Sequence, residues 1–207
     1  MDSEYYAVDI ALIPEAETLD FFIGLNRKLV EISGDRSIRL GESACLPHIS
    51  LAMGRVRASD IKDLEGRLSK AVSGYLPYKA VYKGYAVVAG SGGDPVSGAD
   101  VVRDETIEKL QEMVAGILGD FSSGKMTSEC FSGDTSVITD FSLDYSENYL
   151  TRQTGENFSP HITIGHGDVT RVEGLQPPEN FSCDRLVICR LGNHCTCAEV
   201  LESIKGI

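Results

Sequence analysis

The sequence predicts an α+β fold, and three of its features indicate this class. An apolar, β-branched stretch near the N-terminus is followed directly by an amphipathic helical pattern, and the second half of the chain repeats this outline. The chain then closes on a hairpin pattern. With 207 residues, of which 42% are hydrophobic, the chain can fill one ordinary core or two small lobes.

The first half alternates extended and helical segments. Tyr5 to Ile13 (YYAVDIALI) is rich in β-branched and aromatic residues and stops at Pro14, which predicts a buried strand. The segments expected after it are a helix from Glu15 to about Ile32, an extended stretch from Ser37 to Val56, a helix from the cap residue Ser59 to Val72, and a strand from Tyr78 to Ala89.

The second half begins with a loop. Gly90 to Gly98 (GSGGDPVSG) has no apolar period, and it is the best candidate for a lobe boundary, near residues 90 to 100. The segments expected after it are a helix from Asp104 to Leu118, a loop from Gly119 to Gly133, a strand from Ser136 to Leu143, an irregular loop from Asp144 to Ser159, and a hairpin of Arg185 to Leu191 and His194 to Val200 around Gly192-Asn193.

One short pattern, Pro-His-Ile-(Ser/Thr), occurs twice, at His48 and at His161. Side chains alternate along a strand, so His48 and Ser50 share one face, as do His161 and Thr163, while the apolar residues between them face the core. The proline before each histidine suits the first residue of a strand. Each motif therefore combines a core face with a polar face.

These residue types suit the cleavage of a phosphodiester beside a ribose hydroxyl. Such a reaction needs one group that takes a proton from the nucleophile and another that gives a proton to the leaving oxygen. Histidine can hold either state near neutral pH. The hydroxyls of Ser50 and Thr163 can donate hydrogen bonds to the phosphate oxygens. We therefore expect His48, His161, Ser50 and Thr163 to be catalytic, with no metal and no cofactor.

The two motifs resemble those of the two-histidine (2H) phosphoesterases, which include the 2′,5′-RNA ligase-like proteins and cyclic phosphodiesterases. The family's His-x-(Ser/Thr)-x motifs are matched by His48-Ile49-Ser50-Leu51 and His161-Ile162-Thr163-Ile164. The resemblance implies a bilobal fold, with pseudo-two-fold duplicated lobes of antiparallel sheet and helices, and an active site in the cleft between them. The long separation of the motifs places insertions in the loops at residues 90–98 and 119–133.

Charge limits the partners. The net charge of −12 and the isoelectric point near 4.7 oppose binding of a long duplex nucleic acid, so we expect a small nucleotide or an RNA end as substrate. No apolar run is long enough for a membrane span, and the acidic start lacks the basic region of a secretory signal. These features predict a monomeric, cytoplasmic protein with reduced cysteines.

Two other interpretations stay open. The same cleft could hold a nucleotide or RNA end without turning it over, as a binding module. A zinc site around His194, Cys195 and Cys197 is the other, although Cys-x-Cys is not a common zinc spacing, and alternation would turn His194 away from two cysteines that share a face.

Four residues outside the motifs are less clearly assigned. His166 lies just past the second motif, either at the mouth of the site or as an exposed strand-end residue, so we leave it off the catalytic set. Tyr145, Tyr149 and Arg152 either belong to a solvated loop or clamp a phosphate and stack on a base.

Overall fold

A computed structural model describes residues 4–41, 45–90, 92–174 and 176–206. Within these ranges the protein has four α-helices and seven antiparallel strands, which confirms the α+β class. The helices are α1 (Ala16–Ser33), α2 (Ile61–Val72), α3 (Glu105–Gly119) and α4 (Asp140–Arg152). The strands are β1 (Tyr5–Pro14), β2 (Ile49–Arg57), β3 (Tyr78–Ala89), β4 (Pro95–Val101), β5 (His161–His166), β6 (Asn180–Leu191) and β7 (Cys197–Lys205).

Three stretches on which predictions were made fall outside the described residues. They are most of the acidic start (1–3), the part of the extended stretch at 42–44, and Ser91 in the predicted loop. The described parts of β1, α1, β3, α3 and the final hairpin agree with the predicted segments to within a few residues at most of their ends.

Six of the strands form a closed circuit. The order is β1-β2-β5-β4-β3-β6-β7, and β1 also pairs with β6, so β7 alone extends from the circuit. Strands β2 and β5 are joined by a single residue pair, Ile49 with Ile162. Those two residues follow His48 and His161 directly, so the circuit brings the two histidine motifs side by side. The duplication of the lobes and the boundary near residues 90–100 stay predictions.

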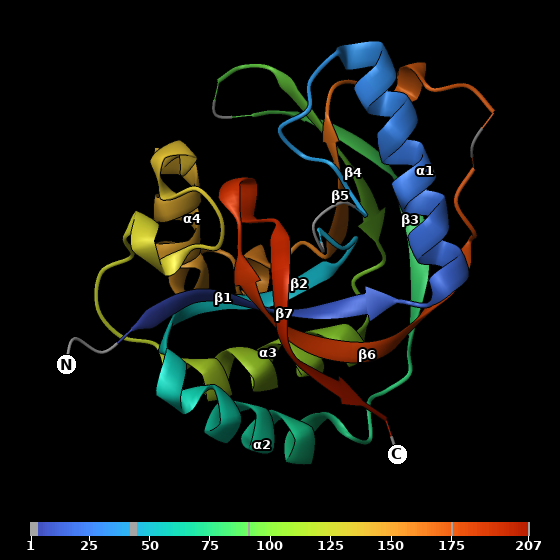
Figure 1. The fold of residues 1–207 in the computed structure, drawn as a ribbon. Coiled ribbons are helices and arrows are strands. Elements are labelled where there is room, and N and C mark those ends of the chain that lie inside the picture. The colour runs from blue at the N-terminus through green and yellow to red at the C-terminus, as the bar shows by residue number, and fades with distance from the viewer. Residues whose placement is uncertain (1–3, 42–44, 91, 175, 207) are drawn as a thin grey trace.

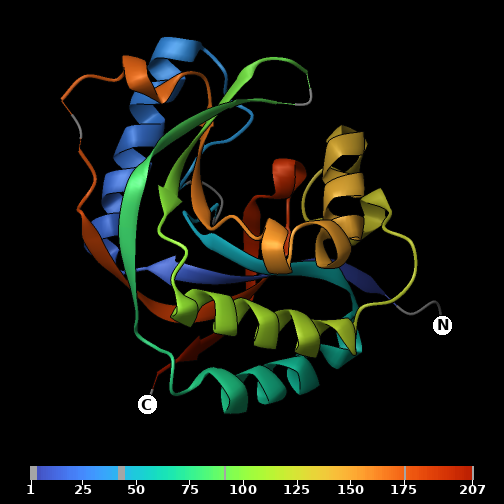
Figure 2. The same cartoon turned by 180° about the vertical axis from the view of Figure 1, so that it is seen from behind.

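The helices cover different parts of this circuit (Figures 1 and 2). Helices α2 and α3 lie side by side beneath it, where α3 packs on β2 and α2 contacts β7. Helix α1 lies along β5, and α4 stands apart, against β2 and the turn before β7. The inner faces of α2 and α3 are fully buried, including Leu64, Leu68, Ile107 and Val114. This apolar layer supports β2 from the side opposite its polar residues.

The predictions for residues 136–159 were wrong. The β-branched run Val137-Ile138-Thr139 suggested a strand, but Thr139 is the N-cap of α4, and its side chain accepts a hydrogen bond from the amide of Ser142. The polar sequence after it is helical because aromatic residues recur at every fourth position, at Phe141, Tyr145 and Tyr149. Helix α4 therefore replaces both the expected strand and most of the expected loop.

Smaller corrections concern the segment ends. Helix α2 begins at Ile61 after a short 3₁₀ turn (Ala58–Asp60), so Ser59 is not its cap. The predicted loop from Gly90 to Gly98 is the turn of a β3–β4 hairpin, and β4 already begins at Pro95, where proline suits the start of a strand. In the last hairpin, residues Asn193–Cys195 form a 3₁₀ turn, and β7 begins only at Cys197.

Candidate active site

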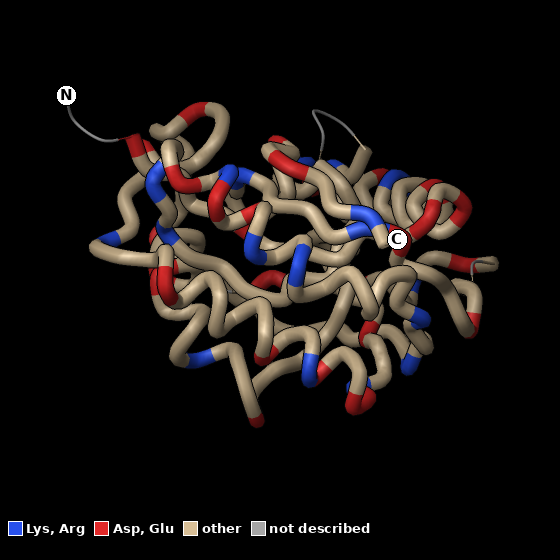
Figure 3. Tube along the Cα trace, turned by 90° about the horizontal axis from the view of Figure 1, so that it is seen from below, with Lys and Arg blue, Asp and Glu red and all other residues tan. Residues whose placement is uncertain are grey.

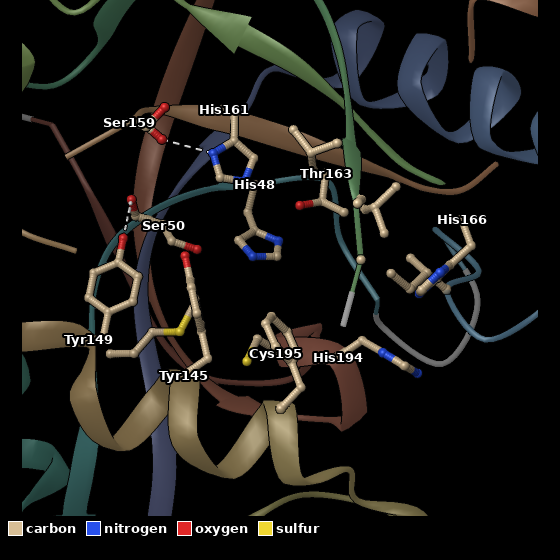
Figure 4. Close-up of a pocket in the computed structure, with 17 residues that line it drawn as sticks. His48, Ser50, Tyr145, Tyr149, Ser159, His161, Thr163, His166, His194 and Cys195 are labelled. Carbon is tan, nitrogen blue, oxygen red and sulfur yellow. Dashed lines mark hydrogen bonds between the residues drawn. The ribbon is translucent and has the colours of Figure 1, made fainter. Parts of the chain in front are cut away.

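All four histidines of the chain line one cavity of about 490 Å³. The walls come from β2, β5, α4, the β3–β4 hairpin and the turn before β7. His48 and His161 lie close together in the middle of this cavity, with Tyr145 and Tyr149 on one side and His166 and His194 on the other (Figure 4). The structure therefore brings together every residue of the predicted catalytic set.

Both motif strands present side chains to the cavity at the same three positions. His48, Ser50 and Met53 line it from β2 and the residue before it, and His161, Thr163 and His166 line it from β5. Simple alternation would turn the third residue of each set away. In both strands a β-bulge inserts one extra residue before it, Leu51 in β2 and Ile164 in β5. The bulge shifts the alternation and returns the third side chain to the cavity.

The two catalytic candidates are held in the same way. The Nδ1 atom of His48 lies 2.7 Å from the carbonyl oxygen of Leu46, and that of His161 lies 2.8 Å from the carbonyl oxygen of Ser159. A carbonyl oxygen can only accept, so in each ring Nδ1 carries a hydrogen and donates it. The proton exchanged in a reaction therefore belongs to Nε2 in both residues.

Asp9 distinguishes the two histidines, and it was not among the residues predicted from the sequence. Its carboxylate is fully buried in the middle of β1, and Oδ2 lies 3.4 Å from Nε2 of His48. Its other oxygen, Oδ1, has no hydrogen-bond partner among the described residues. Burial opposes the charged form of His48, but the hydrogen bond and charge of Asp9 prevail and raise the pKa of His48 to about 9. The signal was available, because Asp9 is the one acid within an apolar strand.

The two hydroxyl groups of the motifs differ in their partners. Ser50 donates a hydrogen bond of 2.6 Å from Oγ to Oδ2 of Asp9. Thr163 lines the cavity, and no side-chain hydrogen bond engages its hydroxyl among the described residues. Thr163 is thus free to donate to a ligand, whereas the proton of Ser50 is directed toward Asp9.

Helix α4 supplies an aromatic wall. Phe141 stacks on Tyr145 at 5.2 Å between ring centroids, and Tyr145 meets Tyr149 edge to face at 5.6 Å. All three residues line the cavity, and the hydroxyl of Tyr149 donates to the carbonyl oxygen of Ser50. Arg152 is exposed instead and pairs with Asp144 at 3.1 Å, so the structure does not place it among the lining residues.

The residues of the alternative zinc site do not converge. His194 and Cys195 have positive φ values of 57° and 55°, so the expected alternation along a strand is absent there. Cys195 packs with Met53 in one cluster, while Cys197 packs with Cys189 in another, so the prediction that the two cysteines share a face was wrong. Over the ranges that the structure describes, no three His, Cys, Asp or Glu side chains group as a metal site requires. No helix in those ranges has the length and apolar character needed to cross a bilayer.

Several solved structures share this fold. The chain is similar to E. coli LigT complexed with NADP+, with a TM-score of 0.58 and 14% identity over 99% of each chain. It is also similar to TT0787 of Thermus thermophilus, with a TM-score of 0.56 and 15% identity over 96% of this chain and 97% of that one. A third structure, E. coli LigT complexed with ATP, has a TM-score of 0.50 and 13% identity over 98% and 99% of the two chains.

At 13 to 15% identity these matches show the fold alone, and at that level they agree with the fold that the motif resemblance implied. No family model and no curated protein sequence matches the chain.

Proposed function

We propose that this protein is a metal-independent phosphoesterase that hydrolyses a 2′,3′-cyclic nucleotide or an RNA-end phosphodiester. The observation that carries the proposal is the pair of His48 and His161 in one cavity, each with Nδ1 fixed by a backbone carbonyl. In both rings Nε2 is the nitrogen available for proton transfer. Paired titratable groups that converge in a cavity are the usual pattern of acid–base catalysis.

The surroundings of the two histidines support a different role for each. His48 lies beside the Asp9 carboxylate, which favours a protonated ring, so His48 acts as the general acid. His161 makes no ion pair within the described ranges and acts as the general base. As water attacks the phosphorus atom, Nε2 of His161 takes a proton from it, and Nε2 of His48 gives a proton to the departing ribose oxygen. The product is a phosphomonoester, and the two roles exchange if the reaction runs toward ligation.

The hydroxyl groups complete the proposed site. The negative charge on the phosphate oxygens grows as water attacks, and the hydroxyl of Thr163 is placed to donate a hydrogen bond to one of them. We assign Ser50 a positioning role, through the hydrogen bond that holds Asp9 in place beside His48. A ligand that approaches Ser50 meets the hydroxyl oxygen, which can still accept a hydrogen bond.

The volume of the cavity and the net charge of the protein support the proposed class of substrate. A cavity of about 490 Å³ suits a nucleotide, and the aromatic wall of α4 offers faces on which a base can stack. Complexes of LigT with NADP+ and with ATP show that similar folds hold nucleotides. The net charge of −12 favours a small or terminal phosphate over a long nucleic acid.

The test is turnover of 2′,3′-cyclic nucleotides and of short RNAs with cyclic phosphate ends, with EDTA present. His48→Ala and His161→Ala should each lower kcat by about 10²- to 10⁴-fold, and the double variant should lose little more, because the two residues act in one proton-transfer system. Arg152→Gln, which removes an exposed cation from α4, serves as the control. Near wild-type turnover in either histidine variant would contradict the mechanism.

The binding module is the alternative, and one contact favours it. In this structure Nε2 of His48 faces Asp9 at 3.4 Å, an arrangement that also suits a purely structural ion pair. Calorimetry with the same nucleotides separates the two functions. Binding without any product in the purified protein supports the module and refutes the hydrolase.

A further inference from the structure

The proposed mechanism leaves two of the four histidines unused. The rings of His166 and His194 meet edge to face with their centroids 5.1 Å apart, and both line the cavity. They lie together on one side of His48 and His161, opposite Tyr149 (Figure 4). One comes from the end of β5 and the other from the turn before β7, so the fold joins two distant segments to make the pair.

A β-bulge aims His166 into the cavity. Gly165 adopts a φ of +151°, and the extra residue Ile164 changes the alternation of β5 just before His166. The carbonyl oxygen of Ile164 accepts a hydrogen bond of 2.7 Å from the buried side chain of Asn26 on α1. On β2 the same bulge presents Met53 at the equivalent position, so the bulge itself does not require a histidine.

An unusual backbone conformation directs the side chain of His194 into the cavity. Its φ of 57° is in the left-handed region, which is unfavourable for a residue other than glycine. The side-chain oxygen of Ser142 on α4 accepts a hydrogen bond of 2.8 Å from the amide of His194. The amide oxygen of the preceding Asn193 accepts from Thr139 and from Ser142. The start of α4 thus holds this turn in the conformation that directs His194 to His166.

Among the lining residues on this side of the cavity, these two histidines are the groups that can take up a positive charge. No lysine or arginine lines the cavity in the described part of the chain. Burial and the nearby His166 ring hold the pKa of His194 below its ordinary value, against the opposite effect of Asp35. Three other titratable groups lie on the facing elements: Tyr145, whose pKa burial raises to about 12, and Tyr149 and Cys195, whose pKa values burial also raises. All three are neutral at physiological pH, so an anion that enters here meets the two imidazoles, with the Asp35 carboxylate as the nearby negative charge.

We propose that His166 and His194 form a subsite for a second phosphate of the substrate, so that the preferred ligand is a cyclic or terminal phosphodiester that carries another phosphate. This inference rests on the proposed function and specifies its substrate. The second phosphate is either the 5′-phosphate of a mononucleotide or the next phosphodiester of an oligonucleotide. Two imidazoles that share one anion provide charge-assisted hydrogen bonds as they take up protons.

The spacing along β5 suits such a ligand. His161 pairs with Asp100 and His166 with Val96, so the two histidines are four residues apart as counted along β4. At a rise of ~3.3 Å per residue this is about 13 Å between backbone positions. Between two imidazoles at the ends of this span there is room for a nucleotide that carries a phosphate at each end. Thr163 lies between the two histidines on the same face.

The experiment compares kcat/KM for three substrates: a nucleoside 2′,3′-cyclic phosphate, the same compound with a 5′-phosphate, and a dinucleotide that ends in a 2′,3′-cyclic phosphate. For at least one of the two longer substrates we expect the wild-type enzyme to show a preference of about tenfold or more, larger at pH 6 than at pH 8. The substrate that is preferred identifies the source of the second phosphate.

His166→Met, which copies the residue that β2 presents at the equivalent position, and His194→Gln should each bring this ratio close to one. The ratio is an internal control for folding, because a partly unfolded enzyme loses activity on all three substrates together. Arg152→Gln, which removes a cation outside the cavity, should leave the ratio as in the wild type. A wild-type preference below about threefold, or a preference that persists in both histidine variants, overturns the proposal.

A binding measurement separates this inference from the proposed function. Calorimetry with adenosine 2′-monophosphate and adenosine 2′,5′-bisphosphate needs no turnover. Tighter binding of the bisphosphate that is lost in His166→Met supports the subsite even if the protein hydrolyses nothing. Equal binding of the two ligands counts against the subsite even if the protein proves to be an active phosphoesterase.

Discussion

Two histidines with the same local geometry have different electrostatic surroundings in this protein. His48 and His161 occupy matching motifs and donate Nδ1–H to a carbonyl oxygen two residues earlier. Only His48 has a buried carboxylate, Asp9, beside Nε2. A symmetric pair would leave the direction of proton transfer undefined, whereas one buried charge is enough to separate the acid from the base.

The change Asp9→Asn tests this assignment. Without the carboxylate, burial is opposed only by the smaller effects of Cys197 and the Leu46 carbonyl, so the pKa of His48 should fall from about 9 to its ordinary value of 6.5 or below. The high-pH limb of the kcat profile, where the general acid loses its proton, should move down with it. Titration of the His48 ring by NMR measures the same change directly. An unchanged His48 titration in the variant would show that Asp9 does not control this proton.

The same change should alter stability in one pH window. A group whose pKa is raised by folding stabilises the native state fully below its unfolded pKa, and this contribution is lost as the pH rises through the folded pKa. The Asp9→Asn change removes the stability that comes from the charged pair. The resulting loss of unfolding free energy should therefore be largest below about pH 6.5, where it is at most ~3 kcal/mol, and should vanish above about pH 9. Urea unfolding at pH 6 and pH 9.5 measures it.

Among single residues, the members of the two motifs could be predicted from the sequence, but the groups that surround them could not. His48 and His161 could be identified because the pattern around them repeats and histidine chemistry is specific. The relation of Asp9 to His48 could not be predicted, since it depends on the pairing of β1 with β2, which joins residues far apart in the chain. The non-equivalence of Ser50 and Thr163 was hidden for the same reason.

Among the elements, the bulged strands and α4 decide what lines the cavity. The strand periods of β2 and β5 were predicted, but a bulge changes the phase of alternation without a clear sequence signal, so Met53 went unmentioned and His166 had no defined position. Helix α4 was missed because its sequence is polar and its short aromatic stripe lines the cavity beside a small hydrophobic cluster, not the main core. Both errors fall at the candidate site, where local preferences give way to function.

The hydrogen bond between Asn26 on α1 and β5 leads to a prediction about how these two elements stabilise each other. Asn26 is buried and donates to the carbonyl oxygens of Ile38 and Ile164 at 3.0 and 2.7 Å, while its own oxygen accepts from the amide of Leu40. Asn26→Leu keeps the branched shape of the side chain but leaves three buried polar groups without partners, so unfolding free energy should fall by about 3 kcal/mol. Chemical denaturation measures the loss.

The control for this prediction is Asn148→Ala on α4, because the side chain of Asn148 is only half-buried and bonds only to Asp144 in the preceding helical turn. It should change unfolding free energy by no more than about 0.5 kcal/mol. Because Ile164 is the bulged residue, hydrogen exchange at the amides of Gly165 and His166 should also quicken in Asn26→Leu. A cost below about 1 kcal/mol would mean that water or a shifted neighbour replaces the lost bonds.

At the scale of the whole molecule, the protein carries a net negative charge, while the cavity is the site that we propose for an anionic substrate. Acidic and basic residues are interspersed on the side shown in Figure 3, but the total charge is −12. The lining of the cavity includes no lysine or arginine in the described ranges, so its attraction for phosphate acts at short range, through imidazole and hydroxyl groups. The long-range field should therefore slow the approach of an anionic substrate.

Added salt should consequently increase kcat/KM for an anionic substrate, whereas it weakens binding in proteins that contact phosphates through a basic surface. The Debye length falls from ~30 Å at 0.01 M to ~10 Å at 0.1 M, which screens the repulsion between substrate and protein surface. Between these concentrations kcat/KM for a cyclic mononucleotide should rise by about threefold or stay level, and it should rise more for an oligonucleotide with more charges. The kcat at saturation, which no longer depends on approach, is the internal reference. A steep fall of kcat/KM with salt would instead indicate counterion release from a basic binding face.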